Sequence, residues 1–245
     1  IRDEGVTFSH CVPTILHMLL NHPDAAETDL SACKLIIGGS ALPQGLARAA
    51  LDRGIDVFTG YGMSETCPIL TLAQLRGGDA DPEAQLRDRT RTGYALPLVQ
   101  LRVVDDDLRD VPGDGVSVGE IVVRAPWLTQ GYLGKPEASE ALWRGGWLHT
   151  GDIGTLDARG MLTVTDRLKD VIKTGGEWVS SLALEDVISR HPAVTEVAVV
   201  AAPDARWGER PLPLVVLKPG QTADESAIRA HVQAAVDAGV LSRFA

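Results

Sequence analysis

Two short apolar segments that each run directly into a glycine turn constrain the fold of this chain more than any other feature. Lys34–Ile37 is followed by Gly38-Gly39-Ser40, and residues 55–58 lead into Gly60-Tyr61-Gly62. A helical stretch at 44–53 separates them. The alternation of strand, turn, helix and strand predicts an α/β layer with a parallel sheet. In such sheets ligands bind beyond the carboxyl ends of the strands, which is where both glycine turns fall.

The middle third of the chain predicts a β-rich subdomain. Strand patterns at 98–104, 119–124 and 146–165 alternate with Asp-rich or Pro-Gly turns, and we expect no helix of any length among them. The preceding residues, 76–91, are polar and are expected to form a loop. The pattern therefore sets residues 1–165 apart as one region of the chain.

After residue 166 the pattern changes to a small α+β unit. Ser180 or Ser181 can cap a helix, and apolar runs at 194–201 and 212–217 predict two strands. Thr222 with Glu225 has the spacing of a capping box, ahead of a helix with Ile228, Val232 and Val236 on one face. We expect a C-terminal domain over 166–245, with its boundary near 166–170.

Composition excludes several classes of protein. The chain has 23 basic and 33 acidic residues, a net charge of −10, and no basic run, so a nucleic-acid partner is not expected. Its three cysteines include no CxxC pair, which disfavours a zinc site or disulfide scaffold and favours a cytoplasmic location. No apolar stretch is long enough to span a membrane. A first residue of Ile1 inside an ordinary folded segment hints at truncation.

The run from Thr59 to Thr66 carries the clearest chemical signal. Tyr61, bracketed by glycines after a strand, offers a flat face to a nucleotide base. The Ser64 hydroxyl and the adjacent Glu65 carboxylate could hold a phosphate oxygen and Mg²⁺, which prefers oxygen ligands. The alternative is a tight turn in which Ser64 and Glu65 only cap a helix.

Two later runs carry weaker signals. Asp152 stands between Gly151 and Gly154 and could accept two hydrogen bonds from a ribose diol, although Asp beside Gly often only caps a turn. Arg167 could reach the same ribose or a phosphate. Its alternative is membership of a surface charge cluster, which contributes little to stability.

Four runs in this order together resemble the adenylate-forming, or AMP-binding, superfamily of acyl- and aryl-CoA synthetases, luciferases and peptide-synthetase adenylation domains. They are GGSALP at 38–43, GYGMSET at 60–66, GWLHTGDIG at 146–154 and DRLKDVIKTGGEW at 166–178. The resemblance covers nearly the whole chain. Residues 175–178 and 8–13 look most like medium-chain fatty-acyl-CoA ligases.

For the nucleotide, the resemblance implies a role for each matching residue of the first two runs. Gly38, Gly39 and Ser40 would form one wall of the adenine pocket, and Tyr61 would stack on the base. Ser64 would hydrogen-bond the α-phosphate, and Glu65 would coordinate Mg²⁺. Gly62 would belong to the same site, where the lack of a side chain would leave room for a longer acyl chain. The equally weighted alternative is that Gly62 only serves the turn.

The later runs imply contacts to ribose and coenzyme A. Asp152 would bind the ribose hydroxyls, assisted by Arg167. Residues 1–165 would be the C-terminal part of the large domain. Lys169 matches the hinge near 166–170, about which the small domain swings between two half-reactions. Gly175 and Gly176 would line the pantetheine tunnel, with Trp178 packed beside it.

The resemblance implies an ATP-dependent acyl-CoA ligase with ATP or AMP, Mg²⁺ and coenzyme A as cofactors and a small carboxylic acid as substrate. Whether it forms a homodimer stays open. Alternatives are an adenylation enzyme that passes its acyl group to a carrier protein or to oxygen, and a non-catalytic nucleotide-binding remnant. A flavodoxin-like redox domain is disfavoured by Glu65 and Asp152.

Two parts of the family pattern are absent from this sequence. We find no Ser/Thr/Gly-rich phosphate loop ending in Lys-Gly, and none of the five lysines follows a Pro-Lys-Thr stretch. We therefore expect the 245-residue chain alone not to form acyl-adenylate, because phosphate binding and charge compensation are incomplete. We also expect the truncated large domain to leave apolar sheet surface uncovered, which promotes aggregation.

Overall fold

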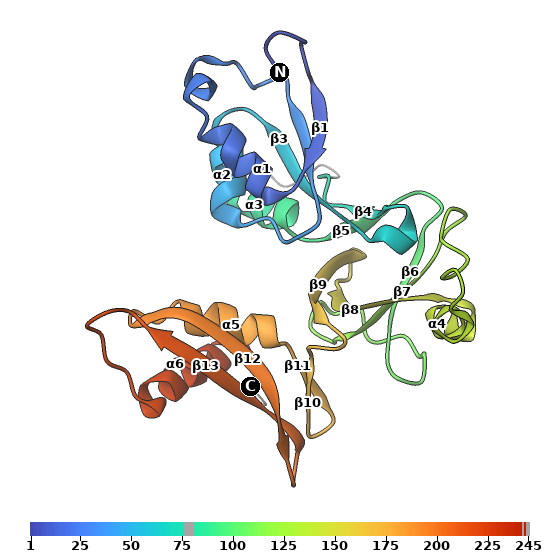
Figure 1. Ribbon diagram of the computed structural model, residues 1–245, viewed down its shortest axis with the longest axis vertical. Helices are drawn as coiled ribbons and strands as arrows, with labels where there is room; N and C mark the ends of the chain where they lie inside the picture. Colours follow the sequence, from blue (N-terminus) through green and yellow to red (C-terminus); the bar gives the residue numbers. More distant parts are fainter. Residues whose placement is uncertain (76–80, 242, 244–245) are drawn as a thin grey trace. The chain divides into compact units, whose positions relative to one another are not determined.

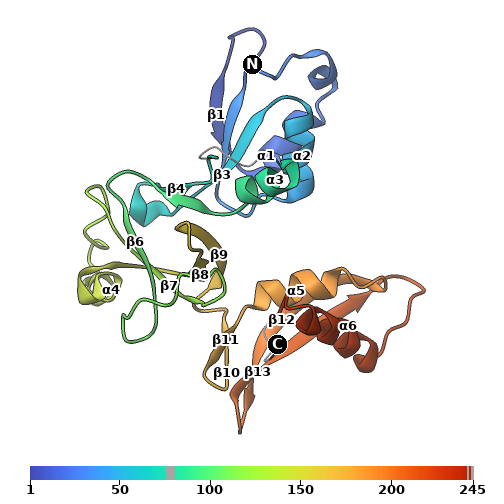
Figure 2. The ribbon, with the colours of Figure 1, turned by 180° about the vertical axis from the view of Figure 1, so that it is seen from behind.

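The computed structural model describes residues 1–75, 81–241 and 243. Its described residues fall into two compact units, one of residues 1–150 with 154–164 and one of residues 151–153 with 165–245. The strands form a nine-stranded mixed sheet and a four-stranded antiparallel sheet (Figures 1 and 2). The chain is therefore an α/β protein with a small α+β C-terminal part, as the sequence predicts.

The first three strands are parallel, as the glycine turns predict. They are β1 (Phe8–Cys11), β2 (Lys34–Ile37) and β3 (Asp56–Gly62), with Ile37 paired to Thr59. Three helices gather on one face of these strands, α1 (Pro13–Leu20), α2 (Gln44–Asp52) and α3 (Pro82–Thr90) (Figure 1). Leu35 and Ile37 are buried in this layer while Lys34 and Ile36 are only half-buried, the period-two pattern of a strand covered better on one face.

The same sheet continues with antiparallel strands. In the order β1-β2-β3-β4-β5-β9-β8-β7-β6 it adds β4 (Ile69–Leu72), β5 (Gly93–Ala95), β6 (Gln100–Val104), β7 (Gly119–Arg124), β8 (Leu148–Leu156) and β9 (Met161–Arg167). The β-rich middle third is thus an extension of the parallel layer. The link is β3, which continues beyond Phe58 through Gly60 and pairs with β4.

Two helices correct the sequence-based prediction. Residues 76–91 were expected to be a loop, but α3 occupies most of this stretch, while 76–80 lie outside the described residues. The middle third was expected to lack helices, yet it contains α4 (Pro136–Leu142). Each helix begins with proline at its first position, and each buries a single leucine, Leu86 or Leu142. Apolar periodicity therefore could not reveal them.

Short 3₁₀ turns complete this part of the chain: η1 (Pro23–Glu27), η2 (Ser64–Thr66) and η3 (Arg144–Gly146).

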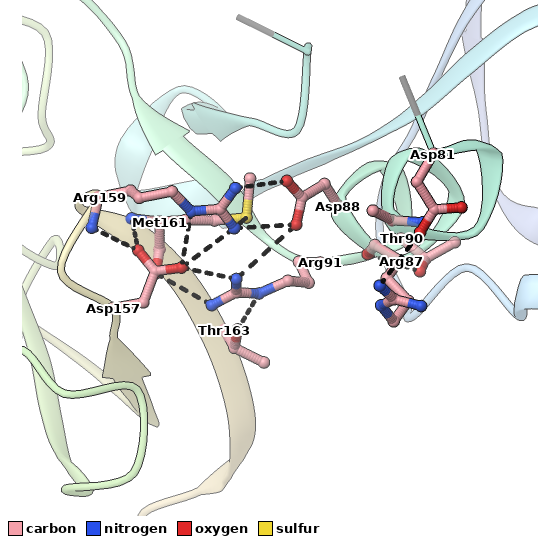
Figure 3. A network of polar contacts seen from close by, with 10 residues as sticks. Asp81, Arg87, Asp88, Thr90, Arg91, Asp157, Arg159, Met161 and Thr163 are labelled. Carbon is pink, nitrogen blue, oxygen red and sulfur yellow. Dashed lines mark hydrogen bonds and ion pairs between the residues drawn. The ribbon is translucent and has the colours of Figure 1, made fainter. Parts of the chain in front are cut away.

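A charge network holds α3 to the turn between β8 and β9 (Figure 3). Arg91 Nη1 lies 2.7 Å from Asp157 Oδ2, and Arg91 Nε donates to Thr163 Oγ1 at 2.8 Å. Arg159 donates to both oxygens of Asp88, at 2.8 and 3.0 Å. Such bidentate pairs are stronger than ordinary surface ion pairs. The network stabilises a helix end that has few apolar contacts.

The second unit is a four-stranded sheet in the order β11-β10-β13-β12, with two helices. Its elements are β10 (Ile172–Thr174), β11 (Glu177–Val179), α5 (Ser181–Ser189), β12 (Val194–Asp204), β13 (Gly208–Leu217) and α6 (Glu225–Asp237). Ser180 caps α5 by accepting the Ala183 N–H at 3.1 Å, one of the two predicted caps. Two of the three residues on the expected helix face, Ile228 and Val232, pack against the core of this unit, and Val236 is half-buried.

The predicted capping box of α6 is wrong. Asp224 caps this helix by accepting the Ala227 N–H at 2.9 Å, so the helix begins at Glu225 and Thr222 lies before the cap. An Asp directly before the first helical residue is as good a cap as Thr, and its position decided the outcome.

The opposite face of β12 and β13 carries exposed apolar side chains. Leu212, Leu214 and Val216 are 47, 55 and 54% exposed, and Val200 on β12 is 43% exposed. These side chains belong to the small C-terminal unit, so the uncovered apolar surface expected on the large domain stays a prediction. No helix among the described residues is long and apolar enough to cross a membrane.

Candidate nucleotide site

The two glycine turns lie side by side at the carboxyl edge of the parallel strands. A Cβ placed on Gly38 would lie 3.2 Å from the Gly60 carbonyl oxygen, and Gly38 N–H donates to Cys11 O at 3.0 Å. Gly39 has a φ of +81°, which favours glycine, and Ser40 after it is exposed. The backbones therefore approach more closely than side chains would allow.

Tyr61 and Gly62 end β3 in different environments. Tyr61 is half-buried and packs against the apolar cluster that contains Leu70. A Cβ on Gly62 would lie only 1.6 Å from the Pro68 carbonyl oxygen, so no side chain fits there. The turn itself therefore requires glycine at position 62. That Gly62 also leaves room for a longer acyl chain stays a prediction.

A buried threonine anchors the turn that carries Ser64 and Glu65. Thr66 is fully buried, its Oγ1 accepts the Met63 N–H at 2.9 Å, and the same oxygen lies 2.5 Å from Pro68 O. In contrast, Ser64 is exposed and Glu65 is half-buried. The turn therefore has a fixed interior and presents a hydroxyl and a carboxylate outward.

Glu65 is held from both its backbone and its side chain. Its carbonyl oxygen accepts the Thr129 N–H at 2.9 Å, and Oε1 accepts the Tyr132 hydroxyl at 2.7 Å. This hydrogen bond raises the pKa of Tyr132 above its usual value. Sequence reasoning missed Tyr132. A signal was available, because Gly131-Tyr132-Leu133-Gly134 repeats the glycine-bracketed aromatic of Gly60-Tyr61-Gly62.

Asp152 and Arg167 form an ion pair within the second unit. Arg167 Nε lies 3.1 Å from Asp152 Oδ1, with side chains 66% and 10% exposed respectively. Gly151 beside the aspartate has a φ of +68°, and its carbonyl oxygen accepts the Leu168 N–H at 2.8 Å. The structure thus brings together the two residues that the sequence assigned to the ribose.

The remaining predicted residues lie in the same unit, in two turns and on β11. Lys169 is 75% exposed, and its Nζ lies 4.0 Å from Asp170. Gly175 and Gly176, with φ of +60° and +86°, form the turn between β10 and β11. Trp178 on β11 lies under the Lys173 ammonium, 4.7 Å from Nζ to the ring centroid. Glycines at positive φ keep this turn narrow.

Glu65 belongs to the first unit and Asp152 to the second, so their convergence on one AMP stays a prediction. Among residues 1–75, 81–241 and 243 no group of three or more His, Cys, Asp or Glu side chains is arranged to hold a metal ion. Mg²⁺, however, is commonly held by one or two carboxylates plus substrate phosphates. The single carboxylate of Glu65 is therefore a sufficient protein ligand for a Mg²⁺ ion that binds together with a nucleotide.

Glycine turns at a parallel sheet edge, followed by an outward hydroxyl–carboxylate pair, are typical of a nucleotide-binding α/β protein. Comparison with known families agrees. The AMP-binding enzyme family model matches residues 1–133, and that of the AMP-binding enzyme C-terminal domain matches residues 183–244. The chain belongs to the AMP-binding enzyme family.

Several relatives are CoA ligases. The chain is 42% identical over 217 residues to the long-chain-fatty-acid–CoA ligase of Thermus thermophilus, covering 87% of this chain and 40% of the relative. It is 37% identical over 234 residues to the 3-methylmercaptopropionyl-CoA ligase of Ruegeria lacuscaerulensis, covering 93% and 43%. The chain thus spans about two fifths of the length of these curated relatives.

Solved structures show the same likeness. Amide bond synthetase McbA from Marinactinospora thermotolerans superposes with a TM-score of 0.75 at 32% identity, covering 98% of this chain and 48% of that one. A Mycobacterium tuberculosis fatty acyl CoA synthetase gives 0.67 at 33% identity, covering 99% and 45%.

Proposed function

We propose that the protein containing this chain is an ATP-dependent acyl-CoA ligase. A carboxylate oxygen of the acid would attack the α-phosphorus of ATP, releasing pyrophosphate and forming an acyl-adenylate. The thiol sulfur of coenzyme A would then attack the acyl carbon and release AMP. The observation that carries this proposal is the pair of abutting glycine turns followed by the outward Ser64 and Glu65. Relatives named as CoA ligases support it.

Each candidate residue has a proposed task on the nucleotide. The edge formed by Gly38, Gly39 and Ser40 would bind adenine together with Tyr61. The Ser64 hydroxyl would donate to the α-phosphate. Glu65 would hold Mg²⁺, which would supply charge neutralisation on the phosphates.

The second unit would bind the ribose and admit the thiol. Asp152 would accept hydrogen bonds from the ribose hydroxyls, and Arg167 would fix the carboxylate that does so. The Gly175-Gly176 turn beside Trp178 would line the pantetheine path, because small residues admit a narrow arm. Lys169, exposed in the turn after β9, would be the hinge position for movement of the small domain over 166–245.

The experiment is an acid panel on the gene product that contains this chain. Acids of two to sixteen carbons and 3-methylmercaptopropionate would be supplied with ATP, Mg²⁺ and coenzyme A, and acyl-CoA and pyrophosphate would be measured. We expect thioester formation with at least one acid. Residues 1–245 alone are expected to release no pyrophosphate. Absence of acid-dependent pyrophosphate release from the longer product would contradict the proposal.

A second candidate is transfer of the acyl group to another acceptor. The likeness to an amide bond synthetase favours testing amines, and carrier proteins stay an alternative. Replacing coenzyme A by a panel of amines, or by a carrier protein with its pantetheine arm, separates these activities. A product with one of these, and none with coenzyme A, would change the proposed acceptor while leaving the adenylation step in place.

A further inference from the structure

Tyr132 lies outside the four sequence runs assigned to the nucleotide, yet it contacts the carboxylate of Glu65, the proposed Mg²⁺ ligand. Its hydroxyl donates to Glu65 Oε1 across a separation of 67 residues, at 2.7 Å. This distance is at the upper end of the range for a hydroxyl that donates to an ionised carboxylate. In the described part of the chain, Glu65 Oε2 accepts no hydrogen bond.

Tyr132 is itself held in place by α4. The Ser139 Oγ accepts the Tyr132 N–H at 2.8 Å, and the same hydroxyl lies 2.8 Å from Lys135 O. A Cβ on the preceding Gly131 would lie 2.6 Å from the Ser139 Oγ, and the φ of Gly131 is +153°. Only glycine therefore lets the loop approach this serine closely.

The other end of the loop is fixed as well. Thr129 N–H donates to the Glu65 carbonyl oxygen at 2.9 Å, and Trp143 Nε1 donates to the Thr129 carbonyl oxygen at 3.1 Å. The loop therefore contacts the Glu65 backbone through Thr129 and the Glu65 side chain through Tyr132. Ser139 of α4 holds Tyr132 in place, and Trp143, the residue after α4, holds Thr129.

We propose that Tyr132 is a positioning residue that orients the Glu65 carboxylate, so that Oε2 is presented to the metal ion of the bound nucleotide. This inference rests on the proposed function, because the metal arrives with ATP. A free glutamate must lose rotamer freedom when it binds a metal. A hydrogen bond that fixes one oxygen beforehand removes part of that cost. Partners that orient metal ligands in this way typically affect metal affinity or activity by about 10- to 100-fold.

The test is Tyr132→Phe in the gene product that contains this chain. Calorimetry would give the Kd for Mg²⁺·ATP and, separately, for AMP without metal. We expect the Kd for Mg²⁺·ATP to rise about tenfold and the Kd for AMP to stay within twofold. The Mg²⁺ concentration for half-maximal adenylation should rise in parallel. An unchanged Mg²⁺ dependence, or equal weakening of AMP and Mg²⁺·ATP, would overturn the proposal.

Leu133→Ala is the matched control. Leu133 is adjacent, fully exposed and contributes nothing to the Glu65 contacts. Its variant should bind both nucleotides as the unmodified protein does. Ser139→Ala, which removes the anchor of Tyr132, should give a smaller shift in the same direction as Tyr132→Phe.

A double-variant cycle tests whether Tyr132 acts through Glu65. In a Glu65→Gln background, Tyr132→Phe should change the Kd for Mg²⁺·ATP by less than about twofold. A full tenfold effect in that background would show an independent role and overturn the proposal. If Glu65→Gln alone leaves the Mg²⁺ dependence unchanged, the metal role of Glu65 fails. If the unmodified protein shows no adenylation, the proposed function fails while the binding cycle still reports on Tyr132.

Discussion

The Arg167 guanidinium lies 3.1 Å from the Asp152 carboxylate, which is itself almost inaccessible to solvent. An ionised carboxylate in this position needs a partner, and the arginine provides one. We predict that Asp152→Asn weakens AMP binding by roughly 10- to 100-fold, since hydrogen bonds to a charged group contribute about 1.5–3 kcal/mol.

The readout for Asp152 is the ratio of the dissociation constants of 2′,3′-dideoxy-AMP and AMP. The unmodified protein should prefer AMP, and the variant should lose that preference. Asp170→Asn, at an exposed carboxylate of the same unit, should keep it. A preference retained by the Asp152 variant would contradict the ribose assignment.

Asp157 should make stability depend on pH in the acid range. Burial alone would raise the pKa of Asp157, but hydrogen bonds from the Met161 N–H and the Arg91 guanidinium outweigh it and lower the pKa from 3.8 to about 2. A carboxyl with a lowered folded-state pKa contributes stability above its unfolded value. That contribution, about 2 kcal/mol, is lost as the pH falls from about 4 to about 2.

Urea unfolding from pH 6 to pH 2.5 measures this contribution of Asp157. Asp157→Asn should be less stable than the unmodified chain at pH 6, and the gap should narrow as the pH falls. Asp107→Asn changes the same charge at an exposed position and should give a small, nearly constant difference. If the stability difference between Asp157→Asn and the unmodified chain stays constant across this pH range, the predicted dependence of stability on Asp157 ionisation is wrong.

Gly62→Ala should destabilise the protein strongly. The added Cβ would meet the Pro68 carbonyl oxygen and the Ile69 Cα, both of them backbone atoms that cannot swing away. We expect a loss of about 3 kcal/mol or more in the free energy of unfolding. Gly45→Ala in α2 is the opposite control, because the added Cβ meets nothing within 4 Å. This variant should gain about 0.5–1 kcal/mol in the free energy of unfolding. Equal melting temperatures for the two variants would refute the predicted clash.

Replacing Leu98 by glycine should stabilise the protein. It has a φ of +72° and is 74% exposed, so it has a strained backbone without the benefit of burial. A left-handed conformation costs a side chain about 1–2 kcal/mol, and Leu98→Gly should recover about 1 kcal/mol, seen as a higher Tm. Leu133→Gly, at an exposed leucine outside the left-handed region, should lower the Tm slightly. A lower Tm for Leu98→Gly would contradict this account.

The sequence predicts what local patterns encode. The parallel strands were visible because apolar runs end in glycine turns, and the Asp152–Arg167 pair because both residues belong to runs that resemble a known family. Helices α3 and α4 were not predicted, because each buries one leucine and depends on contacts made elsewhere, such as those of Arg91. Non-local charge pairs leave no periodic trace in a sequence.

Tyr132 shows the same limit at the candidate site. Its partner Glu65 is 67 residues away, and only the neighbouring positions of the loop and the β3 turn bring them together. Gly62 is a further example. The clash with Pro68 that makes glycine necessary in the turn depends on the folded backbone, and the acyl-chain interpretation stays a prediction.

The chain passes between its two units three times, after Thr150, after Ile153 and after Val164. The backbone therefore joins the two units at three points, and segment 151–153 places Asp152 in the unit that contains Arg167. A C-terminal fragment that began at residue 165 would contain Arg167 but lack its ion-pair partner Asp152. Anyone who wishes to exchange the C-terminal unit between family members should transplant residues 151–153 together with it.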